Sequence, residues 1–446
     1  MERITIFEIE KCTNGVLSKK LDLEFIDYIS TNSKDIKENT LFIPLIGETL
    51  DGHDFINDAY ENGCRNFLCD KNHSIDLEAN VITVENTELA LGDISKFYKE
   101  KFNIPFIAVT GSVGKTSTKD IISSVLKEKY NVLKNEGNFN NNIGVPQTLL
   151  NLNSNHDIAV IEMGMDKKGE LTYLSNIVKP DIAVISNIGQ SHIMNFEDGQ
   201  DGIFKAKMEI ANGLKDNGIL LVNGDDKYLK TLKGKESKYK LITYGFENDN
   251  DIYIKEFEIF DTYSNFTCVY KEKEYNFDIK SVAKHNIFNA LAAIVIGFEY
   301  GLTKNQIDDG FDTMTLSKNR LDIFDTHKYK IINDTYNASY DSIMSGLEVL
   351  NNFKGRKVAI LGDVLELGSH SERIHRQIGK DLKCDLLITI GNDSKYINEE
   401  TNIENYYFPT KEEFYKEANS LLEDGDVILV KASRGIKLDE VVEFLK

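Results

Sequence analysis

The residues best suited to chemistry lie at positions 109–120, where VTGSVGKTSTKD interrupts an apolar run with glycines, a lysine and hydroxyl groups. The preceding FIAV predicts a buried strand, and the following segment predicts a helix. In this setting glycines let the backbone approach an anion, helix amides point toward it, and Lys115 neutralises its charge. The Thr116 hydroxyl suits a magnesium ion. The pattern predicts a nucleotide phosphate site formed by Gly111, Ser112, Val113, Gly114, Lys115, Thr116 and Ser117.

The match is to a short G-x-x-G-K-T form, because Val109 stands where the full Walker pattern has a glycine. The alternative is a glycine turn with a purely structural role. A phosphate-binding loop is compatible with a kinase, a switch, a motor or a ligase, so other residues must separate these classes.

A second polar segment, NEGNFNNNIGVPQTLL at positions 135–150, places Asn138, Asn140 and Asn141 in one loop. So many side-chain amides would lack partners in a core. The segment is either a solvated turn or a loop that binds a polar ligand.

Two further side chains follow predicted strands: Glu162 ends VIEMG, and His192 lies beyond VISNIG. Carboxyl ends of strands line the ligand crevice of a doubly wound sheet, so both are expected near Thr116. Magnesium prefers oxygen ligands, and a histidine can join a second cation site. A lone glutamate in such a place is otherwise a helix cap or an ion-pair partner.

Several residues are weaker candidates. Asn286 begins a predicted helix, where it either caps the helix or reaches an adenine base. Arg320, Asp334, Asn337 and Arg434 also lie near strand ends, and arginines there offer fork-shaped contacts to phosphate or carboxylate groups. By pattern alone, Lys207 is an ordinary lysine on the water-facing side of an amphipathic helix.

Buried strands such as IAVIEMG, IAVISNIG, KVAILGD and VILVKAS alternate with amphipathic helices. This alternation predicts an α/β fold with mostly parallel sheets. Length and the breaks in the pattern predict three domains, at residues 1–102, 103–315 and 316–446.

The formal charge of −20 argues against non-specific binding to nucleic acid or to an anionic membrane. The five cysteines are scattered, without metal-ligand spacing, as expected of reduced thiols. The N-terminus lacks the apolar segment of a signal peptide, and we find no run long enough for a membrane span. A cytoplasmic protein is therefore expected.

Ten motifs occurring in order along the chain resemble the Mur ligase family. They include STNSKDIKENTLFIPLIGETLDGHDF, TGSVGKTSTK, NFNNNIGVPQTLL, EMG, AKMEI, HNIFNALAA, NRLDIF, INDTYNASYDS, LGDVLELGSHSERIH and SRGIKLDEVV. The resemblance implies an N-terminal domain for the UDP end of the substrate, a central P-loop ATPase domain and a C-terminal Rossmann-like domain that closes over ATP.

The resemblance also implies roles for individual residues. Ser33 and Lys34 would contact UDP, although the family's Asp-Ser-Arg motif reads Asn-Ser-Lys here. Lys207 would be carbamylated, and the carbamate with His192 and Glu162 would hold a second Mg²⁺. Asp334 and Asn337 would contact ribose and adenine, in a motif where Tyr340 replaces the usual proline.

The activity implied is ATP-dependent joining of D-alanyl-D-alanine to the terminal carboxylate of UDP-MurNAc-tripeptide through an acyl phosphate, in peptidoglycan precursor synthesis. Lys115, Lys207 and His192 would act in catalysis, and Asn138, Asn140, Asn141 and Arg434 would bind substrates; we expect a monomer. The absence of a DNPR motif favours the dipeptide-adding member. The alternatives are a sister ligase that adds one amino acid, a folylpolyglutamate-type ligase, a P-loop kinase or switch, and a non-catalytic sugar-nucleotide binder.

Overall fold

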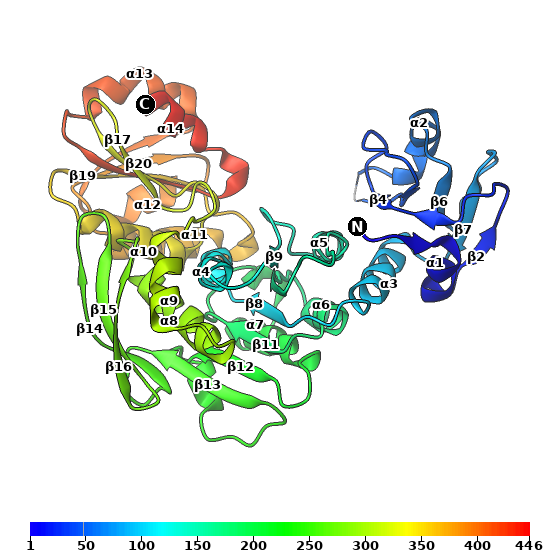
Figure 1. Cartoon of the computed structure of the whole chain (residues 1–446). Helices are drawn as coiled ribbons and strands as arrows, with labels where there is room; N and C mark the ends of the chain where they lie inside the picture. Colours follow the sequence, from blue (N-terminus) through cyan, green and yellow to red (C-terminus); the bar gives the residue numbers. More distant parts are fainter. Residues whose placement is uncertain (48) are drawn as a thin grey trace.

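The computed structural model describes residues 1–47 and 49–446. It contains three successive α/β parts, each with its own main sheet (Figure 1). The predicted fold class is confirmed, with sheets that are mostly parallel. The proposed limits at residues 102 and 315 stay predictions, although both fall in segments without helix or strand.

The N-terminal part has a five-stranded sheet in the order β2-β7-β6-β5-β4, parallel except where β2 joins β7, and a separate antiparallel pair, β1 and β3. Its elements are β1 (Ile4–Thr5), α1 (Ile6–Thr13), β2 (Val16–Ser18), β3 (Phe25–Ile26), β4 (Tyr28–Ser30), β5 (Thr40–Phe42), α2 (Ile56–Glu61), β6 (Asn66–Asp70), β7 (Asn80–Val84) and α3 (Thr87–Lys99). Helix α3 packs against α5 and α6 of the central part and so joins the two parts (Figure 1).

The central part has a nine-stranded sheet in the order β16-β15-β14-β13-β12-β11-β8-β10-β9, antiparallel only among β14, β15 and β16. Its elements are β8 (Phe106–Thr110), α4 (Lys115–Lys127), β9 (Val132–Lys134), α5 (Gly144–Leu149), β10 (Ile158–Glu162), α6 (Glu170–Val178), β11 (Ile182–Ile185), α7 (Gln200–Met208), β12 (Ile219–Asn223), β13 (Lys240–Gly245), β14 (Ile252–Ile259), β15 (Ser264–Tyr270), β16 (Lys273–Ile279), α8 (Lys284–Glu299) and α9 (Lys304–Asp312).

The C-terminal part has a six-stranded sheet in the order β17-β18-β22-β19-β20-β21, with only β17 antiparallel. Its elements are β17 (Asp322–Asp325), β18 (Lys330–Asn333), α10 (Tyr340–Asn351), β19 (Lys357–Gly362), α11 (Ser371–Asp381), β20 (Leu386–Ile390), α12 (Lys395–Glu400), β21 (Glu404–Phe408), α13 (Lys411–Leu421), β22 (Val427–Lys431) and α14 (Asp439–Leu445).

Strands β8, β10 and β11 of the central sheet are buried on both faces, as their continuous apolar sequences predict. Along β8, Phe106 and Ala108 join the core shared with α3 of the N-terminal part, whereas Ile107 and Val109 join the core beneath α4 and α8. Because side chains alternate along a strand, this one strand anchors two cores and delivers the following loop to the sheet edge between them.

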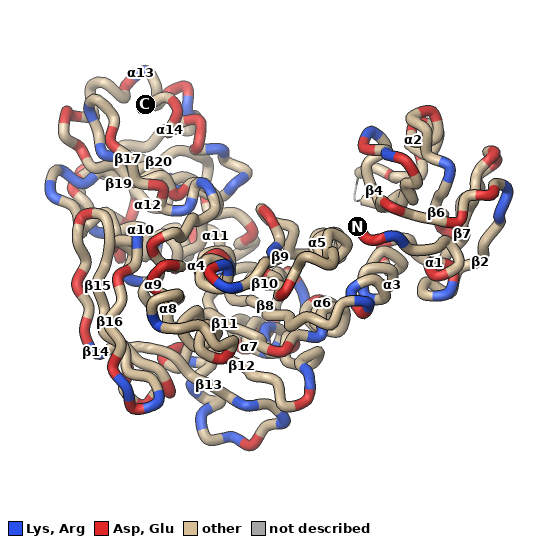
Figure 2. Tube along the Cα trace, in the orientation of Figure 1, with Lys and Arg blue, Asp and Glu red and all other residues tan. Residues whose placement is uncertain are grey.

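Charged residues of both signs are interspersed along all three parts of the chain (Figure 2). Within the described residues, no helix is long and apolar enough to cross a membrane.

Candidate active site

A cavity of about 1100 Å³ lies between the central and C-terminal parts. Its walls include residues 112–117, 140–143, 164–167 and 190–192, Asn138, Glu162 and Asn286 from the central part, with Arg320, Asp334, residues 336–342, residues 364–367 and Arg434 from the C-terminal part. Most of the predicted site residues therefore meet in one cleft. Four predicted site residues are not among the residues of its walls: Ser33, Lys34, Gly111 and Lys207.

The phosphate-binding loop joins β8 to α4, as predicted. Gly114 has φ +81°, which favours glycine, and a Cβ on Gly111 would lie 1.9 Å from the Ser186 hydroxyl oxygen. Lys115 Nζ donates to the Gly111 carbonyl at 2.9 Å. No side chain caps the start of helix α4. Its first backbone amides can therefore donate hydrogen bonds to a bound anion.

Asn187, which the sequence analysis missed, fastens this loop from the end of β11. Its Oδ1 accepts hydrogen bonds from the backbone amides of Ser112 at 3.1 Å and Val113 at 2.9 Å, and its Nδ2 donates to the Val113 carbonyl. The amides of Ser112 and Val113 are thus already engaged. The part of the loop left for phosphate is Gly114 with the first residues of α4.

Glu162 ends β10, is 2% exposed, and has one carboxylate oxygen without a hydrogen-bond partner. Its other oxygen, Oε1, accepts from Asn140 Nδ2 at 2.8 Å. An unpaired buried carboxylate oxygen is costly, and a hard cation would satisfy it. The residues present fit a magnesium ion at Glu162 and the Thr116 hydroxyl.

The asparagine-rich loop at residues 138–142 lines the cleft, and its side chains also make hydrogen bonds that hold the neighbouring residues in place. Asn140 holds Glu162, and Asn141 Oδ1 accepts from the amides of Ile143 and Gly144 at the start of α5. Asn138 contributes its carbonyl to the amide of Asn140 at 2.7 Å. The solvated-turn interpretation is therefore wrong for Asn140, whereas Asn141 is exposed and its side chain fixes the turn before α5.

His192 lies in the cleft beyond β11, with φ +61°. Its Nδ1 lies 3.2 Å from Asp166 Oδ1 and 3.1 Å from Glu366 Oε2, so one imidazole meets carboxylates from two parts of the chain. The hydrogen bond from His192 lowers the pKa of Glu366 below its ordinary value. Sequence reasoning did not single out Asp166 or Glu366, because neither contact is local.

Lys207 lies near the end of α7 and is 2% exposed, so the water-facing interpretation is wrong. Burial lowers its pKa well below the usual value of 10.5, and the charge of Lys115 lowers it further. Helix α7 ends at Met208 and continues as a 3-10 helix over Glu209–Asn212, where the Glu209 carboxylate accepts from the Gly169 amide at 2.8 Å. Lys207 is thus a buried amine whose ionisation is opposed by burial and by the charge of Lys115.

Arg320 and Arg434 lie on the C-terminal wall beside Tyr336. Their guanidinium carbons are 4.0 and 5.5 Å from the centre of the Tyr336 ring, at cation–π distance. Arg320 Nη2 also donates to Thr116 Oγ1 at 2.9 Å, and its Nε has no partner. Arg320 therefore links the two walls and keeps a free donor.

Asp334 and Asn337 lie together at the end of β18, where Asp334 pairs with buried Lys431 and the Asn337 carbonyl accepts from Lys431 Nζ at 3.0 Å. Tyr340 opens α10, which Ser339 caps by accepting from the Ser342 amide. Proline also fits this first helical position, so the departure from the family motif leaves the turn intact.

Asn286 opens α8 and is 1% exposed. Its Nδ2 donates to the Ser281 hydroxyl at 2.9 Å, and its Oδ1 accepts from Asn289. Its hydrogen bonds in the structure are therefore to protein side chains, but it does not cap the helix, because α8 begins at Lys284 without a side-chain cap.

Ser33 and Lys34 lie in the N-terminal part, in the turn between β4 and β5. Ser33 is buried, and its carbonyl accepts from Asn62 Nδ2 at 2.9 Å, whereas Lys34 is exposed. Thr31, just before this turn, accepts a hydrogen bond from Gln147 Nε2 of α5 at 2.9 Å, so the turn lies beside the central part.

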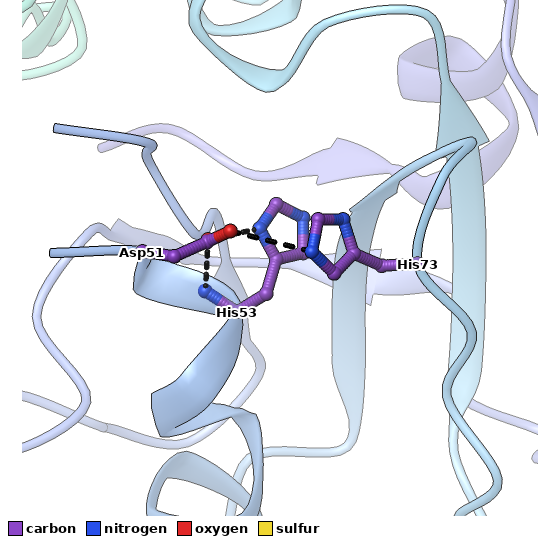
Figure 3. Close-up of side chains that lie close together, drawn as sticks. All are labelled: Asp51, His53 and His73. Atoms are coloured by element: carbon purple, nitrogen blue, oxygen red, sulfur yellow. Dashed lines mark hydrogen bonds and ion pairs between the residues drawn. The ribbon is translucent and has the colours of Figure 1, made fainter.

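The same N-terminal part contains Asp51, His53 and His73 close together, the one His/Cys/Asp/Glu group with metal-ligand spacing in the described residues (Figure 3). His53 Nδ1 lies 2.7 Å from Asp51 Oδ1, and its Nε2 accepts from the Asp70 amide at 3.1 Å. Both ring nitrogens are engaged, so Nδ1 carries the proton and has no lone pair for a metal. The two stacked imidazoles instead fix the turn at Asp51.

Three family models match successive parts of the chain. They are described as Mur ligase family, catalytic domain (residues 25–99), Mur ligase middle domain (residues 109–297) and Mur ligase, glutamate ligase domain (residues 319–434). Together they span most of the chain and all three sheets.

Relatives and solved structures agree over the full length. The UDP-N-acetylmuramoyl-tripeptide--D-alanyl-D-alanine ligase of Bacillus subtilis (strain 168) is 36% identical, covering 100% of this chain and 99% of its own. The Escherichia coli (strain K12) protein of that name is 30% identical, with the same coverage of both chains. A crystal structure of MurF from Acinetobacter baumannii superposes with a TM-score of 0.94 at 29% identity, covering 100% of both chains. The MurF ligase from Thermotoga maritima in complex with ADP gives 0.85 at 26% identity, covering 94% of this chain and 96% of that one.

Proposed function

This chain belongs to the Mur ligase family, and on that premise we propose that it joins D-alanyl-D-alanine to the terminal carboxylate of UDP-MurNAc-tripeptide at the expense of ATP, releasing ADP and phosphate. The observation that carries the proposal is the cleft itself. It sets the predicted phosphate-binding loop and a buried carboxylate, one oxygen of which has no hydrogen-bond partner, on one wall against two arginines on the other.

The chemistry requires activation of the acceptor, because a carboxylate oxygen is a poor leaving group for an incoming amine. Transfer of the γ-phosphoryl group of ATP to the carboxylate gives an acyl phosphate, whose carbonyl the dipeptide amine attacks with loss of phosphate. Such transfer depends on positioning and on neutralisation of charge. Lys115 would lie against the β- and γ-phosphates, and Arg320, whose Nη2 donates to Thr116 Oγ1, lines the same cleft.

Thr116 and Glu162 would hold one Mg²⁺, and His192 with a carbamylated Lys207 would hold a second. Bound magnesium supplies charge stabilisation at the entering and leaving oxygens of the transferred group. Glu162 supports this role with its free oxygen, and Lys207 supports the carbamate because carbamylation needs an uncharged amine. Lys207→Ala should abolish ligation and be rescued in part by short-chain carboxylates, whereas exposed Lys205→Ala on the same helix should have no effect.

Water must be kept from the acyl phosphate, which hydrolyses readily. The contacts of Arg320 with Thr116 and of Glu366 with His192 cross the cleft and would close it over the nucleotide. Asp334 and Asn337 would then face the ribose and adenine, and Asn138, Asn140, Asn141 and Arg434 the reacting ends of the substrates. The UDP end of the long precursor would reach Ser33 and Lys34 in the N-terminal part. We place the reaction in the cytoplasm, where ATP and nucleotide-linked precursors occur, and assign it to a monomer.

The deciding experiment is a substrate screen. Three UDP-muramoyl peptides of increasing length are each offered with ATP and with either D-alanyl-D-alanine or single amino acids. Phosphate release should require the tripeptide precursor and the dipeptide together. Release with a shorter precursor and one amino acid would indicate a sister ligase, and release without a second substrate would indicate a kinase or ATPase.

A further inference from the structure

Lys119 is a buried lysine on α4, one helical turn after Lys115, and it is 1% exposed. It does not reach the cleft wall, and none of the roles proposed above uses it. Burying a lysine costs several kcal/mol unless it is paired. Its surroundings should therefore show what its charge does.

The ammonium group of Lys119 has three partners. Nζ donates to the Asn135 carbonyl at 2.7 Å and lies 3.6 Å from Asp120 Oδ1 and 3.9 Å from Glu162 Oε2. The last contact is an ion pair without a hydrogen bond, so Glu162 Oε2 is held beside a positive charge and still lacks a hydrogen-bond partner. That same oxygen is the one assigned above to magnesium.

Asn135 fixes the backbone of the same glutamate. Its Oδ1 accepts from the Glu162 amide at 2.8 Å, and its Nδ2 donates to the Glu162 carbonyl at 2.9 Å. Lys119 therefore contacts Glu162 directly through the carboxylate and indirectly through Asn135. With Asn140 on Oε1, both oxygens of the carboxylate and its backbone are constrained.

The network continues from Lys119 to the segment that leads into the C-terminal part. Asp120 Oδ1 accepts from Lys134 Nζ at 2.8 Å, and Asp120 Oδ2 accepts from the amide of Ser317 at 3.0 Å and from its hydroxyl at 2.7 Å. Burial raises the pKa of Asp120, but the charges of Lys119 and Lys134 outweigh it and the pKa lies below its usual value. Two lysines thus balance two carboxylates.

We infer that Lys119 is a positioning residue for magnesium: it orients the Glu162 carboxylate through an ion pair at Oε2 that leaves this oxygen without a hydrogen bond, and through Asp120 it links this ligand to Ser317 at the start of the C-terminal part. The inference rests on the function proposed above. Residues behind metal ligands typically change metal affinity by about 10–100-fold when altered.

The test compares Lys119→Met with Lys134→Met. Each variant removes one cation beside Asp120, but only Lys119 is also paired with Glu162. Binding is measured with Mn²⁺ alone as the probe, by the electron paramagnetic resonance signal of the free ion. Lys119→Met should raise the dissociation constant about 10-fold or more. Lys134→Met should change it less than about 3-fold. Equal effects of the two variants would overturn the inference.

A double-mutant cycle with Glu162→Gln tests whether Lys119 acts through Glu162. In the Glu162→Gln background, Lys119→Met should change Mn²⁺ affinity no further, because interacting residues are non-additive. Additive losses would contradict the inference. If Lys119→Met does not fold by circular dichroism, Lys119→Arg takes its place: retained charge should keep the dissociation constant within about 3-fold of the parent, and a larger loss counts against the inference.

Failure of the inference and failure of the proposed function remain distinguishable, because Mn²⁺ binding does not require ligation. If the parent protein shows the expected pattern of Mn²⁺ affinities but makes no ligated product, the proposed function fails and the positioning role stands. If the parent ligates the dipeptide and Lys119→Met binds Mn²⁺ normally, the positioning role fails alone. The Mg²⁺ concentration giving half-maximal ligation should rise in parallel with the Mn²⁺ dissociation constant.

Discussion

The two walls of the cleft differ in how their residues are held. On the central wall, Lys115 donates to Gly111 four residues earlier, and Asn187 fastens the loop from a neighbouring strand of the same sheet. On the C-terminal wall, Arg320 and Glu366 make contacts across the cleft, to Thr116 and His192. The central wall is therefore formed within one sheet, whereas the opposite wall depends on the arrangement of two parts. Variants on the central wall should impair chemistry most, and those on the other wall should impair closure.

The largest effect is expected from Lys115→Ala. Losing the charge against the phosphates should lower kcat by about 1000-fold without unfolding the protein, because the loop remains fastened by Asn187. Ligation is measured with the tripeptide precursor and the dipeptide. Lys127→Ala, an exposed residue near the end of the same helix, is the control. Substantial ligation by Lys115→Ala would contradict the proposed role of Lys115 in phosphate binding and, with it, the proposed difference between the two walls.

Arg320→Ala should lower kcat/KM on the order of 100-fold, since the variant loses a charged donor to the nucleotide and a contact between the walls. The measurement is the same ligation assay, with the KM for ATP determined separately. Arg373→Ala, exposed in the same part, should match the parent. A loss as large as that of Lys115→Ala would show that the walls do not differ as proposed.

Glu366→Gln should lower kcat/KM by about 10-fold, because a charged hydrogen bond across the cleft becomes a neutral one. Small-angle scattering with ATP analogue present should show a smaller share of closed molecules. Glu348→Gln, another carboxylate of the cleft in the C-terminal part, is the matched control. If Glu366→Gln closes as often as the parent protein, the contact between Glu366 and His192 does not contribute to closure of the cleft.

The smallest effect on activity is expected from Lys99→Met, at the junction of the N-terminal and central parts. Burial lowers the pKa of Lys99 to about 8. Between pH 8 and pH 10.5 the unfolded chain binds more protons at Lys99 than the folded chain does, so the free energy of unfolding rises with pH across this window. Below about pH 8 the folded protein bears the full cost of burying a charged Lys99. The variant should gain about 2 kcal/mol at pH 7, shrinking toward zero above pH 10.5. Urea unfolding at several pH values checks this, with exposed Lys168→Met as control. A gain that does not depend on pH would assign the effect to packing.

The difference between the walls also explains what could be predicted. The loop from Gly111 to Ser117 was predicted because its function depends on residues adjacent in the chain. Glu162 and His192 were predicted from strand ends, since parallel strands bring their carboxyl ends to one edge. Asn187, Asp166 and Glu366 were missed because their contacts join segments far apart, and no local pattern marks them.

Lys207 and Lys119 show that the sequence pattern also fails to predict which lysines are buried. Both lie on helices whose patterns suit ordinary surface lysines, yet both are almost fully buried. Only the packing of α7 buries Lys207 where the charge of Lys115 acts on it. Likewise, only the packing of α4 brings Lys119 beside Glu162.

By itself the sequence determined the three-part α/β fold, the strand, glycine loop and helix at residues 106–127, and the order of motifs along the chain. These follow from apolar periodicity and from short spacings, which act over a few residues. The tertiary structure decided which side chains face each other across the cleft, which lysines are buried and which carboxylate oxygen is free. Such properties depend on distances between segments remote in the chain, and one buried charge acquires its function only from the partners that folding brings to it.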